Sequence, residues 1–288
     1  MNSPILSPLP ADPLDSRMGT LLVASGKLTA DDAERVLRMQ RELGIRYGEA
    51  AMRLGLASED DIRQVLARQF GYPYLQPGEA GLSPRLAAAH SPFSAQVESL
   101  RAIRSQLMLR WFAHGRRTLA VVGADPEDGA ALFAANLAVV LSQLGEHTLL
   151  VDANLRNGRQ QELFGLEPGP GLSDLLAGRA DLDVTARVPG FGDLSVLAAG
   201  TVPPNPQELL SREAFRNLHA LFESRYDIVL YDLTPFGVGA DALAAGARAG
   251  GVLLVARKDH TRVHDAAHMA GQFVAAGVEV VGAVVMEF

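Results

Sequence analysis

One stretch of the sequence, residues 118–138, constrains the fold more than any other and reads TLAVVGADPEDGAALFAANLA. An apolar, β-branched run meets a short loop rich in glycine, proline and acidic residues. A long segment rich in alanine and leucine follows, with no helix breaker before Gly145. This order of strand, loop and helix is typical of phosphate-binding loops, in which backbone N–H groups at a helix N-terminus hold phosphates.

The side chains that such a loop needs are replaced in this chain. The pattern requires a small residue, four spacers, glycine, lysine, and then serine or threonine. Ala124 and Gly129 have the right separation, but Ala130 takes the lysine position and Ala131 the hydroxyl position. Glu127 adds a negative charge where a triphosphate would lie, and together with the lost cation this costs on the order of several kcal/mol. We therefore do not expect ATP and Mg²⁺ to bind there.

Apolar runs that could form strands alternate with amphipathic helical segments in the rest of the chain. Strands buried on both faces and separated by helices predict an α/β fold with a mostly parallel sheet flanked by helices. A further helix is expected over about 95–112. The expected strands are Leu119–Val122, Leu149–Val151, Leu194–Leu197, Ile228–Tyr231, Val252–Ala256 and Val280–Val285.

Three more motifs narrow the fold class. Residues 149–156 read LLVDANLR, residues 228–235 read IVLYDLTP, and residues 194–211 read LSVLAAGTVPPNPQELLS. With these motifs, the chain from about Ser94 onward resembles the cytoplasmic domain of the bacterial tyrosine autokinases of polysaccharide export (BY-kinases). These are P-loop proteins close to the MinD and ParA ATPases, so the resemblance implies a P-loop NTPase-like fold.

The resemblance also implies roles for acids and bases of these motifs. In an active family member, the two acidic motifs organise metal and water. Asp152, Arg156 and Asp232 are remnants of that machinery, whereas Asn154 replaces the second acid of the family's D-x-D-x-R motif. The alternative for Asp152 and Asp232 is retained ancestry or strand-end capping. We assign no catalytic residue, because the phosphate-binding loop lacks its lysine and its hydroxyl.

A charged helix motif precedes the loop. Glu98, Arg101 and Arg104 fit the E-x-x-R-x-x-R pattern that closes rings of subunits in the family, and their spacing keeps them near one helix face. The resemblance therefore implies a homo-oligomer. The alternative is a solvated charged face.

An internal repeat occupies the N-terminal part, where residues 17–40 align with residues 46–69 at a constant offset of 29. Thr29 and Ser58 stand at helix N-cap positions and are followed by acids. Each copy therefore predicts a helix, a turn with glycine and a second helix, which together form a small all-α domain. The repeated residues are Arg17, Gly19, Gly26 and Gln40 in the first copy, and Arg46, Gly48, Gly55 and Gln69 in the second.

The repeat resembles the N-terminal domain of MshE-type pilus and secretion ATPases, in which two 24-residue motifs separated by five residues bind cyclic di-GMP. That resemblance implies a cyclic di-GMP site formed by the eight repeated residues. A guanidinium can stack on guanine and pair with phosphate, and a glycine lets the backbone approach a ligand closely. The alternative is a domain that serves packing only. The departures from the commoner leucine-type residues are Lys27, Ala33, Ala51, Ala57 and Ile62.

These features predict four segments: a flexible tail over 1–16, a cyclic di-GMP-binding domain over 17–75, a proline- and glycine-rich linker over 76–93, and the kinase-like domain over 94–288. No apolar run approaches the ~18 residues of a membrane span. No basic segment precedes an apolar one at the N-terminus, so no secretory signal is expected. We expect a cytoplasmic chain, with recruitment to the inner face of the membrane by a partner.

Composition excludes several kinds of site. The chain has no cysteine, which excludes disulfides and thiolate ligands, and its net charge of −7 argues against binding nucleic acid. His260, His264 and His268 recur every four residues, which would place them on one helix face. No acid or thiol cluster joins them, so we expect no metal site there and interpret them as a solvated face.

Two functions from different classes remain. The first is a cyclic di-GMP-responsive, catalytically inactive kinase-like regulator of exopolysaccharide biosynthesis or export. Its partner would be a polysaccharide chain-length-determinant-type membrane protein or other exopolysaccharide machinery. The second is an active ATPase or tyrosine kinase with an unorthodox nucleotide site. Ala130 and Ala131 favour the first, and the five tyrosines are scattered rather than clustered at the C-terminal end.

Overall fold

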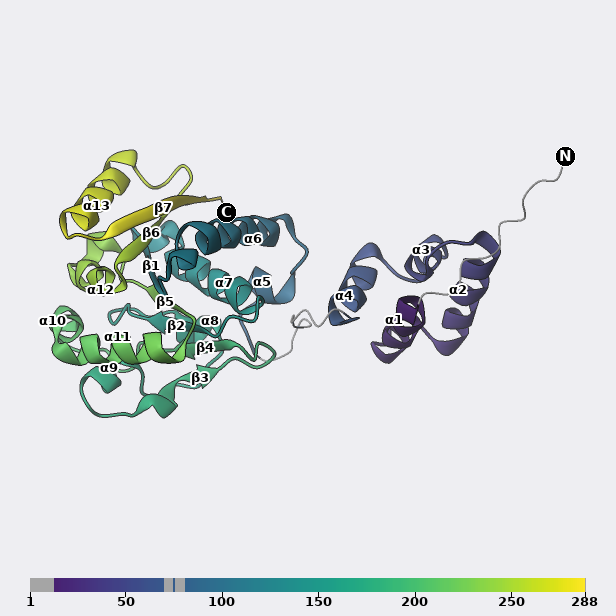
Figure 1. Ribbon diagram of the computed structural model, residues 1–288, viewed down its shortest axis with the longest axis horizontal. Helices are drawn as coiled ribbons and strands as arrows, with labels where there is room; N and C mark the ends of the chain where they lie inside the picture. The colour runs from purple at the N-terminus through teal and green to yellow at the C-terminus, as the bar shows by residue number, and fades with distance from the viewer. Residues whose placement is uncertain (1–12, 70–74, 76–80, 288) are drawn as a thin grey trace. The chain divides into compact units, whose positions relative to one another are not determined.

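The computed structural model describes residues 13–69, 75 and 81–287, without the side chains of residues 13–17 and 68. The chain divides into two compact units, one within residues 1–73 and the other within 74–288 (Figure 1). Among the described residues, no helix combines the length and the apolar content that crossing a membrane requires.

The first unit consists of four helices, α1 (Pro13–Ala24), α2 (Ala30–Leu43), α3 (Tyr47–Arg53) and α4 (Glu59–Gln69). The two predicted N-caps are confirmed. The Thr29 hydroxyl accepts a hydrogen bond from the Asp32 amide at 3.1 Å, and the Ser58 hydroxyl accepts one from the Asp61 amide at 3.1 Å. Each of these aspartates in turn accepts a hydrogen bond from the amide of its cap residue, which completes a capping box at both helices.

The prediction of a flexible tail over 1–16 is wrong for residues 13–16, which open α1. Proline is compatible with the first turn of a helix because its missing N–H would have no intrahelical acceptor there. The rest of the predicted tail, residues 1–12, lies outside the described residues.

The two copies of the repeat pack against each other in a reciprocal way. The second residue of each motif contacts the third residue of the other: a Cβ on Gly19 would lie 3.0 Å from the Tyr47 ring, and a Cβ on Gly48 would lie 3.3 Å from the Met18 sulfur. This exchange is what a pseudo-two-fold axis between the copies produces. It also gives both glycines a packing role, besides the close approach to a ligand that the sequence suggests.

The second unit is built on a seven-stranded sheet of order β3-β4-β2-β5-β1-β6-β7. All pairs are parallel except β3 with β4. The six predicted strands are confirmed, and only the two-residue edge strand β3 was not predicted. The strands are β1 (Thr118–Gly123), β2 (Thr148–Asp152), β3 (Ala186–Arg187), β4 (Leu194–Leu197), β5 (Ile228–Asp232), β6 (Gly251–Arg257) and β7 (Glu279–Met286).

Helices cover both faces of this sheet, and the side chains of successive strand residues lie alternately in two separate hydrophobic cores. Leu119 and Val121 of β1 face the core under α5 to α7, whereas Ala120 and Val122 face the core under α9 to α13. The helices are α5 (Ala87–His90), α6 (Ala95–Arg110), α7 (Ala130–Ser142), α8 (Gln160–Leu163), α9 (Leu172–Leu176), α10 (Pro206–Ser211), α11 (Glu213–Arg225), α12 (Asp241–Ala249) and α13 (Val263–Ala275).

The segment predicted as a linker, 76–93, is part of the second unit from residue 81 onward. Leu82 and Leu86 are buried in the core under α5 to α7, and the buried Asn136 side chain of α7 accepts a hydrogen bond from the Ala88 amide at 2.9 Å. The linker prediction is therefore wrong for 81–93, since proline and glycine also occur in an irregular segment that packs tightly. Residues 76–80 lie outside the described residues.

Candidate functional site

The loop between β1 and α7 has the predicted backbone. Gly129 adopts a positive φ of 81° and forms the N-cap of α7, a conformation that favours glycine. Ala130 and Ala131 follow as the first two helical residues, and Ala130 is 92% shielded from solvent by its neighbours, with 8% exposed. The start of α7 thus offers backbone N–H groups but neither an ammonium nor a hydroxyl.

An acid of the loop itself occupies its interior. The Asp128 side chain is fully buried and accepts hydrogen bonds from the Asp125 amide at 2.9 Å and from the Thr261 hydroxyl. Thr261 in turn accepts a bond from the Arg257 amide at 2.7 Å, so Asp128 fastens the loop to the turn after β6. No sequence motif indicates this contact, because it joins residues 133 apart.

Glu127 points outward, with 68% of its side chain exposed. Its carboxylate lies 3.8 Å from an Arg257 guanidinium nitrogen and 4.0 Å from His260 Nε2. Arg257 thus offsets part of the negative charge that Glu127 brings to the loop.

The two predicted acids lie side by side at the carboxyl ends of adjacent parallel strands. Asp152 of β2 and Asp232 of β5 are register partners, and each is 1% exposed. Asp152 accepts backbone hydrogen bonds from Asn154 and Gln160, at 3.2 and 2.9 Å. The structure therefore brings together two of the three remnants that the family pattern implied, Asp152 and Asp232.

Gln160, which no motif had singled out, closes this pair. Its side chain is fully buried, and its amide nitrogen donates to Asp232 Oδ2 at 2.7 Å and to the Ala131 carbonyl at 3.0 Å. A neutral amide thus lies between the start of α7 and the acid of β5. Because the link spans 72 residues and glutamine is not part of any acidic motif, sequence reasoning missed it.

Burial controls the ionisation of the pair. It raises the pKa of Asp152 to about 7, and the pKa of Asp232 is raised well above its usual range by burial and by the nearby Asp152 charge. Hydrogen bonds from Gln160 only partly oppose these shifts. At neutral pH the pair therefore retains at least part of its protons.

Arg156 pairs with an acid of another element and not with Asp152 or Asp232. Its guanidinium forms a two-point ion pair with Asp241 at the start of α12, in which Nη2 and Oδ1 are 3.2 Å apart. This contact raises the pKa of Arg156 and links the segment after β2 to α12. Asn154, which replaces the second acid of the family motif, accepts a hydrogen bond from the Thr234 hydroxyl at 3.3 Å. Its side-chain amide therefore takes part in a structural contact.

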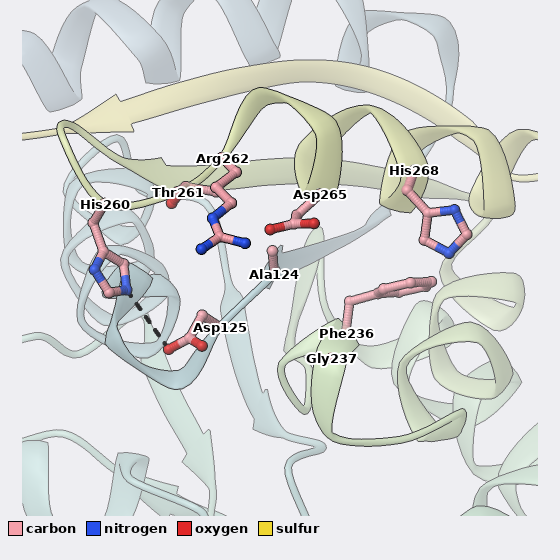
Figure 2. Close-up of a pocket in the computed structure, with 9 residues that line it drawn as sticks. All are labelled: Ala124, Asp125, Phe236, Gly237, His260, Thr261, Arg262, Asp265 and His268. Atoms are coloured by element: carbon pink, nitrogen blue, oxygen red, sulfur yellow. Dashed lines mark ion pairs between the residues drawn. The ribbon is translucent and has the colours of Figure 1, made fainter.

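A cavity of about 660 Å³ borders the loop on the side of α13. Figure 2 shows the Arg262 guanidinium and the Asp125 carboxylate turned into it, with Phe236 and His268 at its far end. Its lining residues are Ala124, Asp125, Phe236, Gly237, His260, Thr261, Arg262, Asp265 and His268.

The three histidines do not share one helix face. His260 lies before α13, 3.8 Å from Asp125, whereas His264 and His268 stack with ring centroids 6.5 Å apart. The prediction of a common face is wrong for His260 because α13 begins only at Val263. Within the described part of the chain, no group of three or more potential ligands could hold a metal ion.

Comparisons with known proteins agree with this geometry. The tyrosine-protein kinase Wzc of Salmonella typhimurium (strain LT2) is 34% identical over 200 residues, which cover 69% of this chain and 28% of Wzc. The kinase domain of the Escherichia coli tyrosine kinase ETK superposes with a TM-score of 0.69 at 32% identity, covering 76% of this chain and 85% of that domain. The chain belongs to this family of bacterial tyrosine kinases.

A more distant neighbour shows the fold alone. The septum site-determining protein MinD of Pyrococcus horikoshii matches with a TM-score of 0.52 at 23% identity, covering 59% of this chain and 70% of MinD. No protein-family model matches the chain. The α/β, P-loop NTPase-like fold predicted from the sequence is confirmed.

The charged motif of Glu98, Arg101 and Arg104 lies on α6. Arg101 pairs with Glu98 of the same helix at 3.1 Å, and an Arg104 guanidinium nitrogen donates to the Val140 carbonyl at 2.7 Å. Arg104 is thus used within its own unit. Leu109 is 68% exposed and, eleven residues after Glu98, lies about three helical turns along the same face.

In the first unit, the repeated residues divide into two groups. Gly26 and Gly55 have φ of 69° and 67° and form the turns after α1 and α3, which favour glycine. Arg46 is exposed at the N-cap of α3, and among the described residues its side chain has no hydrogen-bond or ion-pair partner. The Arg17 side chain lies outside the description.

The remaining repeated residues occupy matching places. Gln40 and Gln69 lie near the ends of α2 and α4, both half-buried. The structure thus places the two copies in equivalent settings, as the repeat predicts.

Proposed function

We propose that the chain is a cyclic di-GMP-responsive, non-catalytic member of the tyrosine-kinase family that regulates exopolysaccharide biosynthesis or export. The observation that carries this proposal is the duplicated first unit, in which two Arg-x-Gly motifs face each other about a pseudo-two-fold axis. A two-fold symmetric dinucleotide suits such a pair. The exposed Arg46 guanidinium is available for stacking on guanine or pairing with phosphate.

The site of the second unit supports the non-catalytic half of the proposal, because its residues do not fit a magnesium nucleotide. Ala130 and Ala131 supply neither the cation for the phosphates nor the hydroxyl for the metal. The Asp128 carboxylate accepts a hydrogen bond from an amide N–H group of the loop, and the Gln160 side-chain amide donates one to Asp232. Protein dipoles thus satisfy the groups that an active family member would turn toward phosphate and metal.

We expect no ATP turnover that depends on this site. Purified chain with ATP and Mg²⁺ should release phosphate no faster than an Asp232→Asn variant, because Asp232 is already engaged by Gln160. The ETK kinase domain is the positive control for the assay. A rate clearly above that of Asp232→Asn would show that the site is catalytic and would overturn this half of the proposal.

One observation favours the second candidate, a chain that binds ATP at an unorthodox site. A cavity of about 550 Å³ beside Gly129 is lined by the guanidinium-bearing Arg85 and Arg257. Two arginines from outside the loop could meet a triphosphate in place of the missing lysine. Calorimetric titration with ATP and with cyclic di-GMP separates the two candidates: our proposal predicts heat from cyclic di-GMP alone.

The chain spans only 28% of the length of Wzc, and we propose that a membrane protein of the chain-length-determinant type is its partner. Such a partner would recruit the chain to the inner face of the membrane. Self-association would occur through the α6 face that carries Glu98, Arg101 and the exposed Leu109.

Light scattering tests this interface. We expect Arg101→Ala to lower the weight-average molar mass, with or without the membrane partner, because the charged motif then loses its central guanidinium. Arg110→Ala, an exposed arginine at the end of the same helix, is the matched control and should associate like wild type. Equal masses for all three proteins would count against the interface.

A further inference from the structure

The two copies of the repeat differ at one position that shapes their surroundings. Ile62 of the second copy fills the space beside Gly48, since its Cγ2 lies 3.0 Å from where a Cβ on that glycine would be. The equivalent residue of the first copy, 29 positions earlier, is Ala33. Beside Gly19, the three atoms nearest to such a Cβ all belong to the Tyr47 side chain.

The smaller side chain leaves a cavity in the first copy. It measures about 530 Å³ and lies between α1 and α2, lined by Gly19, Val23, Ala33, Leu37 and Tyr47 among others. This volume is within the range of about 300–1,000 Å³ that small-molecule sites occupy. Val23 and Leu37 at its edge remain about one-third exposed, at 37% and 36%.

One polar group in this apolar cavity lacks a partner. Tyr47 is 1% exposed, and its hydroxyl is buried with no hydrogen-bond partner among the described residues. Burial also raises the pKa of this phenol, so it is neutral and can both donate and accept. A buried hydroxyl without a partner is costly, which indicates that a polar atom of a ligand completes the site.

We propose that the cyclic di-GMP site is asymmetric: one guanine enters the cavity of the first copy and hydrogen-bonds to the Tyr47 hydroxyl, whereas in the second copy Ile62 fills the equivalent space. This inference rests on the proposed function. An aromatic base fits an apolar cavity that presents one hydroxyl, since its faces are apolar and its edges carry donors and acceptors. The other half of the ligand then lies on the surface of the second copy, near Arg46.

Calorimetric titration of the full chain with cyclic di-GMP tests the asymmetry by a matched pair of substitutions. Ala33→Ile copies the second-copy residue into the first, fills the cavity and should weaken binding at least tenfold. Ile62→Ala makes the reverse change and should leave the affinity within about threefold, at some cost in thermal stability. Tyr47→Phe keeps the ring that packs on Gly19 and should weaken binding about 3- to 10-fold, the range of one neutral hydrogen bond.

The outcomes separate this inference from the function on which it rests. If wild type shows no heat with cyclic di-GMP, the proposed function fails and the inference fails with it. If wild type binds and both Ala33→Ile and Tyr47→Phe bind equally well, only the asymmetric site is overturned. Should Ala33→Ile not fold, Tyr47→Phe decides alone: weaker binding at an unchanged melting temperature supports the site, and unchanged binding refutes it.

Discussion

Replacing Asp232 with asparagine is expected to raise the free energy of unfolding at pH 8 and to change it less at pH 5, because burial raises the pKa of this carboxyl in the folded state. Asp232 and Asp152 are both buried, and no cation contributes to the pKa shift of either. Ionising the pair therefore costs free energy that only the folded state bears. Asparagine removes one charge and can still accept the hydrogen bond from Gln160.

The sign of the pH dependence follows from the raised pKa values. In the unfolded chain both carboxyls ionise near pH 4, whereas in the folded protein the pKa of Asp152 is about 7 and that of Asp232 is also raised. The folded state therefore binds more protons between these limits. The pair's cost is absent below about pH 4, grows as the pH rises through 7, and is largest above it.

Denaturant unfolding at pH 5 and pH 8 measures this effect. The gain from Asp232→Asn should be larger at pH 8 than at pH 5. Asp181→Asn, at an exposed aspartate without a capping hydrogen bond, is the control and should stay within about 0.5 kcal/mol at both pH values. If Asp232→Asn instead destabilised the protein at pH 8, a cation would have to compensate the pair, contrary to the structure.

The sheet was predictable because its signal is local. Apart from Ser195 in Leu194–Leu197, the predicted strands are continuous apolar runs separated by helical segments, which is typical of a parallel sheet. The edge strand β3, Ala186–Arg187, has two residues and leaves no periodicity to detect. The family motifs likewise placed Asp152 and Asp232 at strand ends, where the structure has them side by side.

The parts of the site that sequence could not predict depend on long-range contacts. Gln160 and Thr261 reach Asp232 and Asp128 across 72 and 133 residues, and neither residue belongs to a motif. The linker prediction failed for a related reason. Proline and glycine indicate irregular backbone, but they do not show whether that backbone is packed.

The second large effect concerns cyclic di-GMP. Removing either Arg17 or Arg46 should weaken its binding by about 1.5–3 kcal/mol, the scale of a hydrogen bond to a charged group, or roughly 10- to 150-fold. Arg46 is exposed and has no partner among the described residues, so its loss should not unfold the domain. Arg17 holds the equivalent position in the first motif and is expected to act in the same way.

Related substitutions and ligands test the same site. Gly19→Val and Gly48→Val should also lose binding, but both will disturb the Tyr47 and Ile62 packing and are therefore weaker tests. ATP and GTP should not compete, because neither presents two guanines about a symmetric phosphodiester ring.

Calorimetric titration of the full chain with cyclic di-GMP, beside the Arg17→Ala/Arg46→Ala double variant, tests the receptor assignment most directly. Arg41→Ala, at an exposed arginine between the two motifs, is the matched control. The account predicts saturable binding by wild type and by Arg41→Ala, and no detectable binding by the double variant at the same melting temperature. Absence of binding by wild type at tens of micromolar ligand, or wild-type affinity in the double variant, would contradict it.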